Sequence, residues 1–272
     1  VDVLIFGETG TGKEMVARCL HDLSGAKQEN YVALNCGGMA DNLLDSELFG
    51  HEPGAFTGAQ KRRIGKIEYA SGGTLFLDEV ESMPMNMQIK LLRVLQERVI
   101  ERLGSNQLVP VSCRVVAASK DDLKVLSDQG KFRADLYYRL NVVRIELPPL
   151  RERREDIPAL YDQFLLQAAK RYNRPPPPLT SEHLRRLTAL DWPGNIRELR
   201  NAAECHALGI GRDAPASGGG ESQSLTETVE NYERLLIANE FTRQQGNVAR
   251  TSEALKVART TLHDKLKKYG LI

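Results

Sequence analysis

Short apolar runs alternate with helical patterns over the first half of the chain. The apolar runs, which we expect to be buried strands, are Val3–Phe6, Tyr31–Leu34, Thr74–Leu77, Arg114–Ala118 and Val142–Leu147. Between them, apolar residues recur at the spacing of an amphipathic helix, most clearly over Gln88–Glu97. Such alternation is typical of an open, mostly parallel α/β sheet. The pattern therefore predicts an α/β domain over residues 1–148.

The pattern becomes purely helical after Pro148 and Pro149. Residues 149–208 predict an all-α domain with helices at Ile157–Tyr172, Ser181–Leu190 and Ile196–Leu208. Residues 209–224 contain a glycine- and serine-rich stretch that is typical of a flexible linker. A second all-α domain is expected over 225–272, with helices at Leu225–Gln244, Val248–Leu255 and Arg259–Tyr269.

Composition places few constraints on function. The 272 residues are 41% hydrophobic and 27% charged, which is ordinary for a globular protein. The net charge of +1 gives no overall electrostatic attraction to nucleic acid or membrane. The chain has no run of about 18 apolar residues, so we expect no membrane span. Four cysteines without metal-ligand spacing predict reduced, mostly buried thiols in a cytoplasmic protein. Because a buried strand begins at Val3, we expect a folded segment upstream.

A glycine-rich loop between the first strand and the first helix has the pattern of a phosphate-binding loop. Its residues are Gly7, Glu8, Thr9, Gly10, Thr11, Gly12, Lys13 and Glu14. Backbone N–H groups in such a loop point at phosphate oxygens, and the lysine reaches the β- and γ-phosphates of ATP. The generic pattern has Ser or Thr after the lysine to ligate Mg²⁺, whereas this chain has Glu14.

Two acids, Asp78 and Glu79, end the strand at Thr74–Leu77. Ligands bind at the carboxyl ends of parallel strands, so these acids are expected beside the phosphate-binding loop. Asp78 suits Mg²⁺ coordination, and Glu79 suits orienting and deprotonating the attacking water. The sequence therefore predicts an ATPase with Asp78 and Glu79 as catalytic acids.

Between the two halves of this site lies the string Gly54, Ala55, Phe56, Thr57, Gly58 and Ala59. Glycines at both ends allow sharp bends, and Phe56 has no evident local core to join. With these motifs the chain resembles the bacterial enhancer-binding proteins, which are AAA+ activators of the sigma-54 form of RNA polymerase. The resemblance implies that this GAFTGA loop contacts sigma-54 and that a second loop, at Leu103–Asn106, supports it. His51, beside the loop, is expected to be a solvated histidine.

The resemblance also implies roles for four polar residues. Asn35 would hydrogen-bond Glu79 and restrain it until sigma-54 is engaged. Arg133 and Arg139 match arginines that reach into a neighbouring subunit's site, and Arg197 matches a nucleotide sensor on the helical lid. Residues supplied in trans require a ring, and a hexamer is the family expectation.

One departure from the family pattern follows the fourth apolar run. Most relatives have Ala-Thr-Asn where this chain has Ala118, Ser119 and Lys120. Regulators of C4-dicarboxylate transport share the variant, so we interpret Lys120 as a trait of that subgroup. By analogy with the subgroup, the expected upstream segment is a receiver domain.

The last segment resembles the Fis-type helix-turn-helix domain of the same family. Between Asn247 and Ile272 there are six Lys or Arg and two acids, which gives a local charge of +4. Asn247 is the expected N-cap of the first helix, the turn is Lys256–Ala258, and a longer preceding helix would pair two chains on a palindromic enhancer. The residues expected to contact DNA are Arg259, Thr260, Thr261, His263, Lys265 and Lys268.

Two alternative functions remain. The chain could be an AAA+ remodelling ATPase of another class, which would have no use for the GAFTGA loop. It could also be a DNA-binding regulator whose ATPase has decayed, for which Lys120 is the sole support. The leading interpretation is a sigma-54-dependent activator with an AAA+ P-loop core, an all-α lid and a C-terminal helix-turn-helix.

Overall fold

The computed structural model describes residues 1–25, 30–210, 247–255 and 259–269, together with positions 237, 241, 244 and 257. The chain divides into two compact units, Val1–Ser217 and Gly218–Ile272. Nearly all of the predicted linker, most of the predicted helix Leu225–Gln244 and the turn residues Lys256 and Ala258 lie outside the described residues. No helix within the described ranges is long and apolar enough to cross a membrane.

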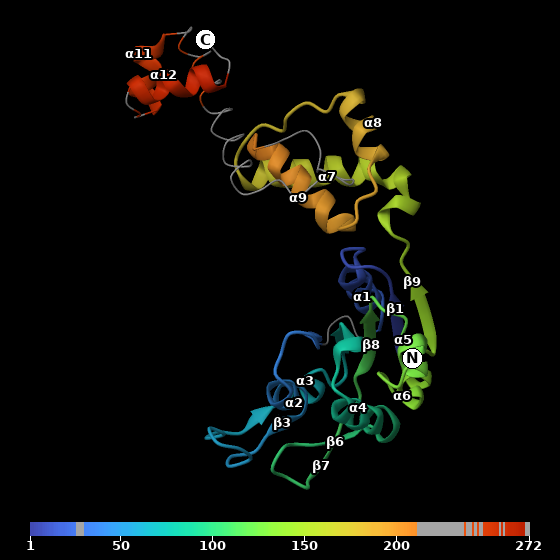
Figure 1. The fold of residues 1–272 in the computed structure, drawn as a ribbon. Coiled ribbons are helices and arrows are strands. Elements are labelled where there is room, and N and C mark those ends of the chain that lie inside the picture. Colours follow the sequence, from blue (N-terminus) through green and yellow to red (C-terminus); the bar gives the residue numbers. More distant parts are fainter. Residues whose placement is uncertain are drawn as a thin grey trace. The chain divides into compact units, whose positions relative to one another are not determined.

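The first unit is built on a parallel five-stranded sheet, as the alternating pattern predicted (Figure 1). The strand order is β2-β5-β8-β1-β9. The strands are β1 (Val3–Phe6), β2 (Tyr31–Asn35), β5 (Thr74–Asp78), β8 (Arg114–Ser119) and β9 (Val143–Glu146). Because all five run parallel, their carboxyl ends meet at one edge, which is where such sheets bind ligands.

Helices cover both faces of the sheet. On one face Ala17 of α1 (Lys13–Asp22) packs in a cluster with Ile5 and Val116. On the other face Leu4 and Val115 belong to a larger core that several helices share. Neighbouring strand residues therefore face different cores, which explains why the strands appear as continuous apolar runs. The helices of the larger core are α2 (Asp41–Phe49), α3 (Lys66–Tyr69), α4 (Met85–Glu97), α5 (Leu123–Asp128) and α6 (Ala134–Leu140).

Two short antiparallel hairpins extend from this core. The first pairs β3 (Gly50–His51) with β4 (Arg63–Ile64) and encloses the GAFTGA string. The second pairs β6 (Val99–Glu101) with β7 (Leu108–Pro110) and encloses the predicted supporting loop.

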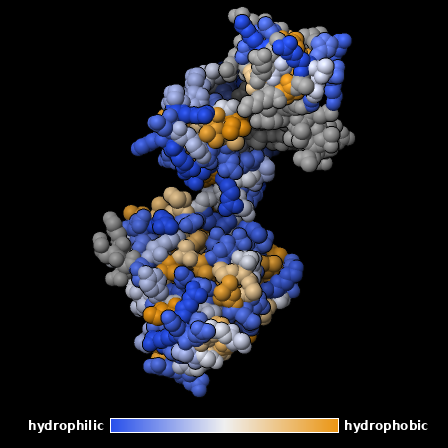
Figure 2. Space-filling view, turned by 90° about the vertical axis from the view of Figure 1, so that its left-hand side faces the viewer, coloured by the Kyte–Doolittle hydropathy of each residue, from blue (hydrophilic) through white to orange (hydrophobic). Residues whose placement is uncertain are grey.

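The surface in Figure 2 is mostly hydrophilic with separate apolar patches.

The rest of the first unit is a three-helix subdomain, which we call the lid. Two short 3₁₀ turns, η2 (Leu150–Glu152) and η3 (Arg154–Asp156), lead into it. Its helices are α7 (Ile157–Arg171), α8 (Ser181–Ala189) and α9 (Asn195–Leu208), close to the predicted bounds. The lid has its own core, in which Trp192 is fully buried and its indole N–H donates to the carbonyl of Leu187 at 2.8 Å.

The described part of the second unit contains α11 (Val248–Leu255) and α12 (Arg259–Lys268). Leu262 and Leu266 of α12 are fully buried and cluster with Ile237. The side-chain oxygen of Asn247 accepts from the backbone N–H of Arg250 at 3.2 Å, so Asn247 caps α11 as predicted.

The expectation that the cysteines are mostly buried is only half right. Cys36 and Cys113 are buried, and burial raises the pKa of the Cys36 thiol to about 12. Cys19 and Cys205 are exposed, because each lies on the solvent side of a helix with a single buried stripe. All four are free thiols.

The lid core generates a prediction about stability. Replacing Trp192 with alanine removes the largest buried side chain of the lid together with its hydrogen bond to Leu187. We expect Trp192→Ala to lower the free energy of unfolding by about 3–5 kcal/mol, measured by chemical denaturation. Leu166→Ala on α7, where the leucine is 50% exposed, is the control and should cost less than about 1 kcal/mol. Equal losses in the two variants would contradict this account of the lid.

Candidate functional site

The loop between β1 and α1 has the backbone that phosphate binding requires. Gly10 and Gly12 have φ of +81° and +103°, in the left-handed region that glycine adopts without strain. Lys13 opens α1 and turns its ammonium group back over the loop. It donates to the carbonyl oxygens of Gly7 at 2.6 Å and Glu8 at 3.1 Å. The lysine and the backbone of this loop therefore face a common space at the carboxyl edge of the sheet.

The two predicted catalytic acids lie at the same edge. Asp78 ends β5 beside Asn35, its register partner on β2, and accepts the backbone N–H of Glu79 at 3.0 Å. Burial raises the pKa of Asp78, an effect that its hydrogen bond from Glu79 and the charge of Lys13 oppose. Burial also lowers the pKa of Lys13, which Asp78, Glu81 and Glu79 oppose. These groups therefore form one electrostatic cluster.

Glu79 has a left-handed backbone, with φ of +53° and ψ of +44°. The backbone of Gly37 approaches its carboxylate so closely that a Cβ at Gly37 would overlap Glu79 Oε2. Asn35 Oδ1 also lies at this glycine and accepts its N–H at 2.6 Å. Within the described residues the amide nitrogen of Asn35 does not donate the expected hydrogen bond to Glu79, and its amide oxygen accepts from its own turn. The two side chains are neighbours across Gly37.

The three predicted arginines have different surroundings. Arg133 forms a bidentate pair with the exposed Asp135, with distances of 3.0 and 2.7 Å. Arg139 donates from two nitrogens to the carbonyl of Leu95, in the last turn of α4, at 3.2 and 2.6 Å. Arg197 is exposed at the start of α9, and its Cβ would lie 3.2 Å from a Cβ placed on Gly10. The structure thus places Arg197 at the phosphate-binding loop of its own chain and the other two on the α4–α6 side.

Asn195, which sequence reasoning missed, joins the lid to the phosphate-binding loop. It is fully buried, with φ of +52°, at the start of α9. Its amide oxygen accepts the backbone N–H of Leu150 at 2.7 Å, and its amide nitrogen donates to Thr9 O at 3.0 Å and Glu8 Oε2 at 3.2 Å. The backbone N–H of Ile196 also donates to Gly10 O at 2.9 Å.

Two arginines of the η2–η3 segment reach the same loop. Arg151 forms a bidentate pair with Glu8, with distances of 2.8 and 2.6 Å, and this hydrogen bonding lowers the pKa of Glu8. Arg153 donates to the carbonyl of Thr11 at 3.0 Å. Thr11 is buried and donates its hydroxyl to Glu8 O at 2.8 Å. The phosphate-binding loop is thus held from the lid side by side-chain hydrogen bonds along its length.

The GAFTGA string forms a closed loop at the tip of the β3–β4 hairpin. Gly54 N–H donates to Ala59 O at 2.8 Å, and Ala59 N–H donates to Phe56 O at 3.0 Å. Gly54 and Gly58 have φ of +83° and +101°. The bends are therefore possible because glycine occupies these two positions.

The structure corrects the expectation for His51 and agrees with that for Phe56, which joins no hydrophobic cluster of the described residues. Phe56 is 46% exposed but packs edge-on against the ring of His51, with ring centroids 4.9 Å apart. His51 is buried rather than solvated, and its Nδ1 lies 2.9 Å from Ser46 Oγ. A histidine next to a loop is buried here because Phe56 covers one side of the ring and α2 supplies the hydroxyl.

The supporting loop is joined to the GAFTGA hairpin by backbone and side chain. Leu103 N–H donates to Gly50 O, and Glu52 N–H donates to Leu103 O, both at 3.0 Å. The buried guanidinium of Arg102 pairs with Glu68 at 2.7 Å and with Glu52 at 3.0 Å. A Cβ on Gly104 would overlap Ala55. The bases of the two loops therefore form one connected body.

The predicted DNA-contacting residues lie along α12. Arg259, Thr260, Thr261, His263 and Lys268 are exposed, and Lys265 is half-buried. The buried residues of the helix, Leu262 and Leu266, face the core of the unit. The helix is thus amphipathic, with a polar and basic surface opposite its apolar stripe.

The donor set at the acids suits Mg²⁺ bound together with a nucleotide. Mg²⁺ is usually held by one or two carboxylates, phosphate oxygens and water. The described residues contain no group of three or more His, Cys, Asp or Glu that could hold a metal, which rules out an all-protein cage there. Glu14 is 60% exposed and pairs with Arg18 at 3.4 Å, whereas Asp78 lies at the strand end within the field of Lys13, so of these two Asp78 is the better candidate ligand.

A phosphate-binding loop, two acids at the adjacent strand end and a helical lid bonded to the loop define the AAA+ class of P-loop proteins. Comparison with solved structures agrees. The chain superposes on NtrX from Brucella abortus with a TM-score of 0.74 and 35% identity, covering 99% of this chain and 64% of that one. A structure of Saccharomyces cerevisiae Hsp104, at 19% identity and a TM-score of 0.58, covering 76% of this chain and 40% of that one, shares the fold alone.

Comparison with known families and curated proteins identifies the family. Residues 1–146 match the sigma-54 interaction domain, 151–210 the AAA+ ATPase lid domain, and 228–269 the Fis family of bacterial regulatory proteins. The chain is 57% identical to the C4-dicarboxylate transport transcriptional regulatory protein DctD of Pseudomonas aeruginosa, over 99% of this chain and 59% of that protein. The chain is also 51% identical to DctD of Rhizobium meliloti, over 100% of this chain and 60% of that protein.

The chain therefore belongs to the sigma-54 interaction domain family, and the resemblance inferred from its motifs is confirmed. It spans about three fifths of the length of the DctD proteins it matches.

The contact between Gly104 and Ala55 generates a testable prediction about the loops. Gly104 has φ of +77°, so Gly104→Ala introduces both backbone strain and an overlap with Ala55. We expect faster hydrogen–deuterium exchange over residues 52–59, because the GAFTGA loop is pushed off its support.

Gly130→Ala is the matched control. Gly130 has φ of +72°, but a Cβ there meets nothing within 4 Å, so the variant carries backbone strain alone. Exchange over residues 52–59 should stay at the wild-type rate. Equal acceleration in both variants would show that Gly104 does not support the loop.

Proposed function

We propose that this chain is the motor and DNA-binding part of a sigma-54-dependent transcriptional activator. In this proposal it hydrolyses ATP in a ring and uses the GAFTGA loop to remodel sigma-54 RNA polymerase while bound to enhancer DNA. The observation that carries the proposal is the convergence of Lys13, Asp78 and Glu79 at one sheet edge in a chain that also presents this loop.

For ATP hydrolysis we assign each polar group a separate task. The loop backbone and Lys13 hold the phosphates, and Asp78 holds Mg²⁺, which would neutralise developing phosphate charge when bound. Glu79 orients the attacking water and accepts its proton. Structures of NtrX with ATP and with ADP support nucleotide binding by this fold.

For assembly we propose a homo-oligomeric ring of family type, with a hexamer as the expected size. Arg133 and Arg139 would reach the neighbour's γ-phosphate, and Asn35 would restrain Glu79 across Gly37. Asp135, the partner of Arg133, is exposed, so Arg133 can leave it for a phosphate at little cost in free energy. Two apolar residues of the same segment, Tyr138 and Val142, are 68% and 55% exposed, which is consistent with an edge that a neighbour covers.

For transcription we propose two macromolecular contacts. Residues Gly54–Ala59, with Phe56 at the centre, contact sigma-54, and the exposed face of α12 contacts a palindromic enhancer in the major groove. Arg197 reports nucleotide state to the lid. Because the DctD proteins extend well beyond the matched region, we also propose an upstream receiver domain. As a regulator of this family, the protein is proposed to act in the cytoplasm.

The two alternative functions find less support. Another class of AAA+ machine would not explain the match of residues 1–146 to the sigma-54 interaction domain. A decayed ATPase would not explain why Lys13 and both acids are retained in one cluster.

Glu79→Gln tests the catalytic assignment. The substitution removes the proton acceptor but keeps the size of the side chain, so ATP should still bind. We expect turnover to fall by about 100-fold or more, measured as phosphate release by the full-length protein. Glu182→Gln on the exposed surface of α8 should leave the rate unchanged. Near-normal turnover in Glu79→Gln would remove Glu79 from its role.

Thr57→Ala tests the coupling of hydrolysis to transcription. The variant should retain ATPase activity, because the loop lies outside the nucleotide site, and should lose ATP-dependent open-complex formation on a sigma-54 promoter. Thr188→Ala in the lid, whose hydroxyl bonds the carbonyl of Leu184, serves as the control. ATPase activity without promoter opening by the wild-type protein would assign the chain to another class of AAA+ machine.

A further inference from the structure

Glu81 is a buried carboxylate with no hydrogen bond. It lies on the 3₁₀ turn η1 (Val80–Ser82), two residues after Glu79, and its side chain is 4% exposed. Neither carboxylate oxygen has a hydrogen-bond partner in the described part of the chain. Buried charges are normally paired and hydrogen-bonded, so this group requires an explanation.

The nearest cation to Glu81 is Lys120. The ammonium nitrogen of Lys120 lies 4.0 Å from Glu81 Oε1, and the lysine is 43% exposed. The pair is therefore asymmetric, with a fixed buried anion and a flexible cation that reaches solvent. A separation of 4.0 Å gives electrostatic attraction without a hydrogen bond, so Lys120 can leave Glu81 more easily than a bonded partner could.

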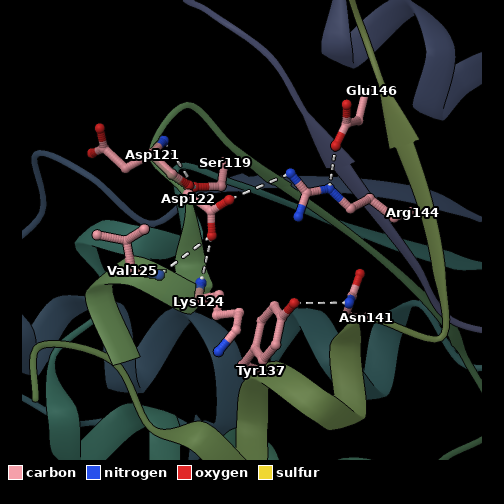
Figure 3. Close-up of polar contacts among 9 residues, drawn as sticks. All are labelled: Ser119, Asp121, Asp122, Lys124, Val125, Tyr137, Asn141, Arg144 and Glu146. Atoms are coloured by element: carbon pink, nitrogen blue, oxygen red, sulfur yellow. Dashed lines mark hydrogen bonds and ion pairs between the residues drawn. The ribbon is translucent and has the colours of Figure 1, made fainter. Parts of the chain in front are cut away.

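The backbone places Lys120 beside the phosphate-binding loop. It follows Ser119, the last residue of β8, whose carbonyl accepts the N–H of Gly7 at 3.2 Å. The Ser119 hydroxyl is occupied, since it donates to Asp121 O at 2.7 Å and accepts Asp121 N–H at 3.2 Å (Figure 3). The side chain available at this strand end is thus Lys120, not Ser119. Lys13 is within the electrostatic range of both Lys120 and Glu81.

We propose that Lys120 exchanges between Glu81 and the terminal phosphate of bound ATP. Lys120 then gives the site a preference for ATP over ADP, and Glu81 limits that preference by competing for the lysine. With ADP or no nucleotide, Glu81 holds Lys120. A γ-phosphate competes for the same ammonium group, because its charged oxygens can accept a direct hydrogen bond from Lys120, whereas Glu81 lies 4.0 Å away. The exchange leaves Glu81 less compensated, which lowers the affinity for ATP relative to a site without the glutamate.

The proposal makes opposite predictions for the two partners. Lys120→Met should weaken ATP binding about tenfold while ADP binding stays near wild type, because one charged contact to the γ-phosphate is lost. Glu81→Gln should tighten ATP binding relative to ADP, because the competing anion is removed. The double variant should resemble Lys120→Met more than Glu81→Gln, since the exchange requires the lysine.

The experiment is a comparison of dissociation constants for ATPγS and ADP, measured by calorimetry with Mg²⁺ on the full-length protein. Lys120→Arg keeps the charge and should retain the preference for ATPγS. Lys124→Met on α5 removes an exposed lysine, 57% exposed and paired with Asp128, and should change neither constant. If Lys120→Met fails to fold because it isolates the buried Glu81, the double variant has no isolated charge and supplies the same measurement.

The outcomes separate this proposal from the function on which it rests. If the wild-type protein binds neither nucleotide, the proposed ATPase function fails. If it binds both and the ratio of the two constants is unchanged in Lys120→Met and Glu81→Gln, only the exchange is wrong. A shift of the same sign in both single variants would also overturn the exchange and leave a merely structural ion pair.

Discussion

The arrangement of the nucleotide site depends on one buried amide, the side chain of Asn195. Its oxygen fixes Leu150, where the chain leaves the sheet, and its nitrogen fixes Thr9 and Glu8 of the phosphate-binding loop. A buried amide has to satisfy its donors and acceptor, and here the lid and the loop supply them together. The lid cannot shift relative to the loop without breaking these bonds. A change in the backbone of the loop would therefore reach the lid through this residue.

The second connected body lies around Arg102. A buried guanidinium with two carboxylate partners is costly to disrupt, because the loss of one partner leaves an uncompensated charge. Glu52 lies in the hairpin just before the GAFTGA loop and Glu68 lies on α3, just after the hairpin, so the two pairs fix the base of the hairpin while its tip stays exposed. A loop with a rigid base and an exposed aromatic tip is suited to transmit a push to a partner. This division explains why the small residues occur at the tip and the charged residues at the base.

The sequence was most informative where the signal is local. Each strand appears as an apolar run, and the phosphate-binding loop is a string of eight residues between a strand and a helix, so both could be predicted. Asn195 could not, because its bond to Glu8 joins residues 187 positions apart. Glu81 looks like a surface acid in the sequence, and only the packing of η1 against β8 shows that it is buried. His51 was misjudged because its burial depends on Phe56 folding back over it.

The left-handed backbone of Glu79 has a consequence for how this site can evolve. A residue with a Cβ at φ of +53° carries strain of about 1 kcal/mol or more, which glycine in its place would relieve. Selection for thermal stability alone would thus favour loss of the carboxylate at this position. Under the proposed function, the glutamate at this position is a case in which stability is traded for chemistry at a single peptide unit. Stabilised versions of this domain obtained without an activity screen would be expected to lose this residue early.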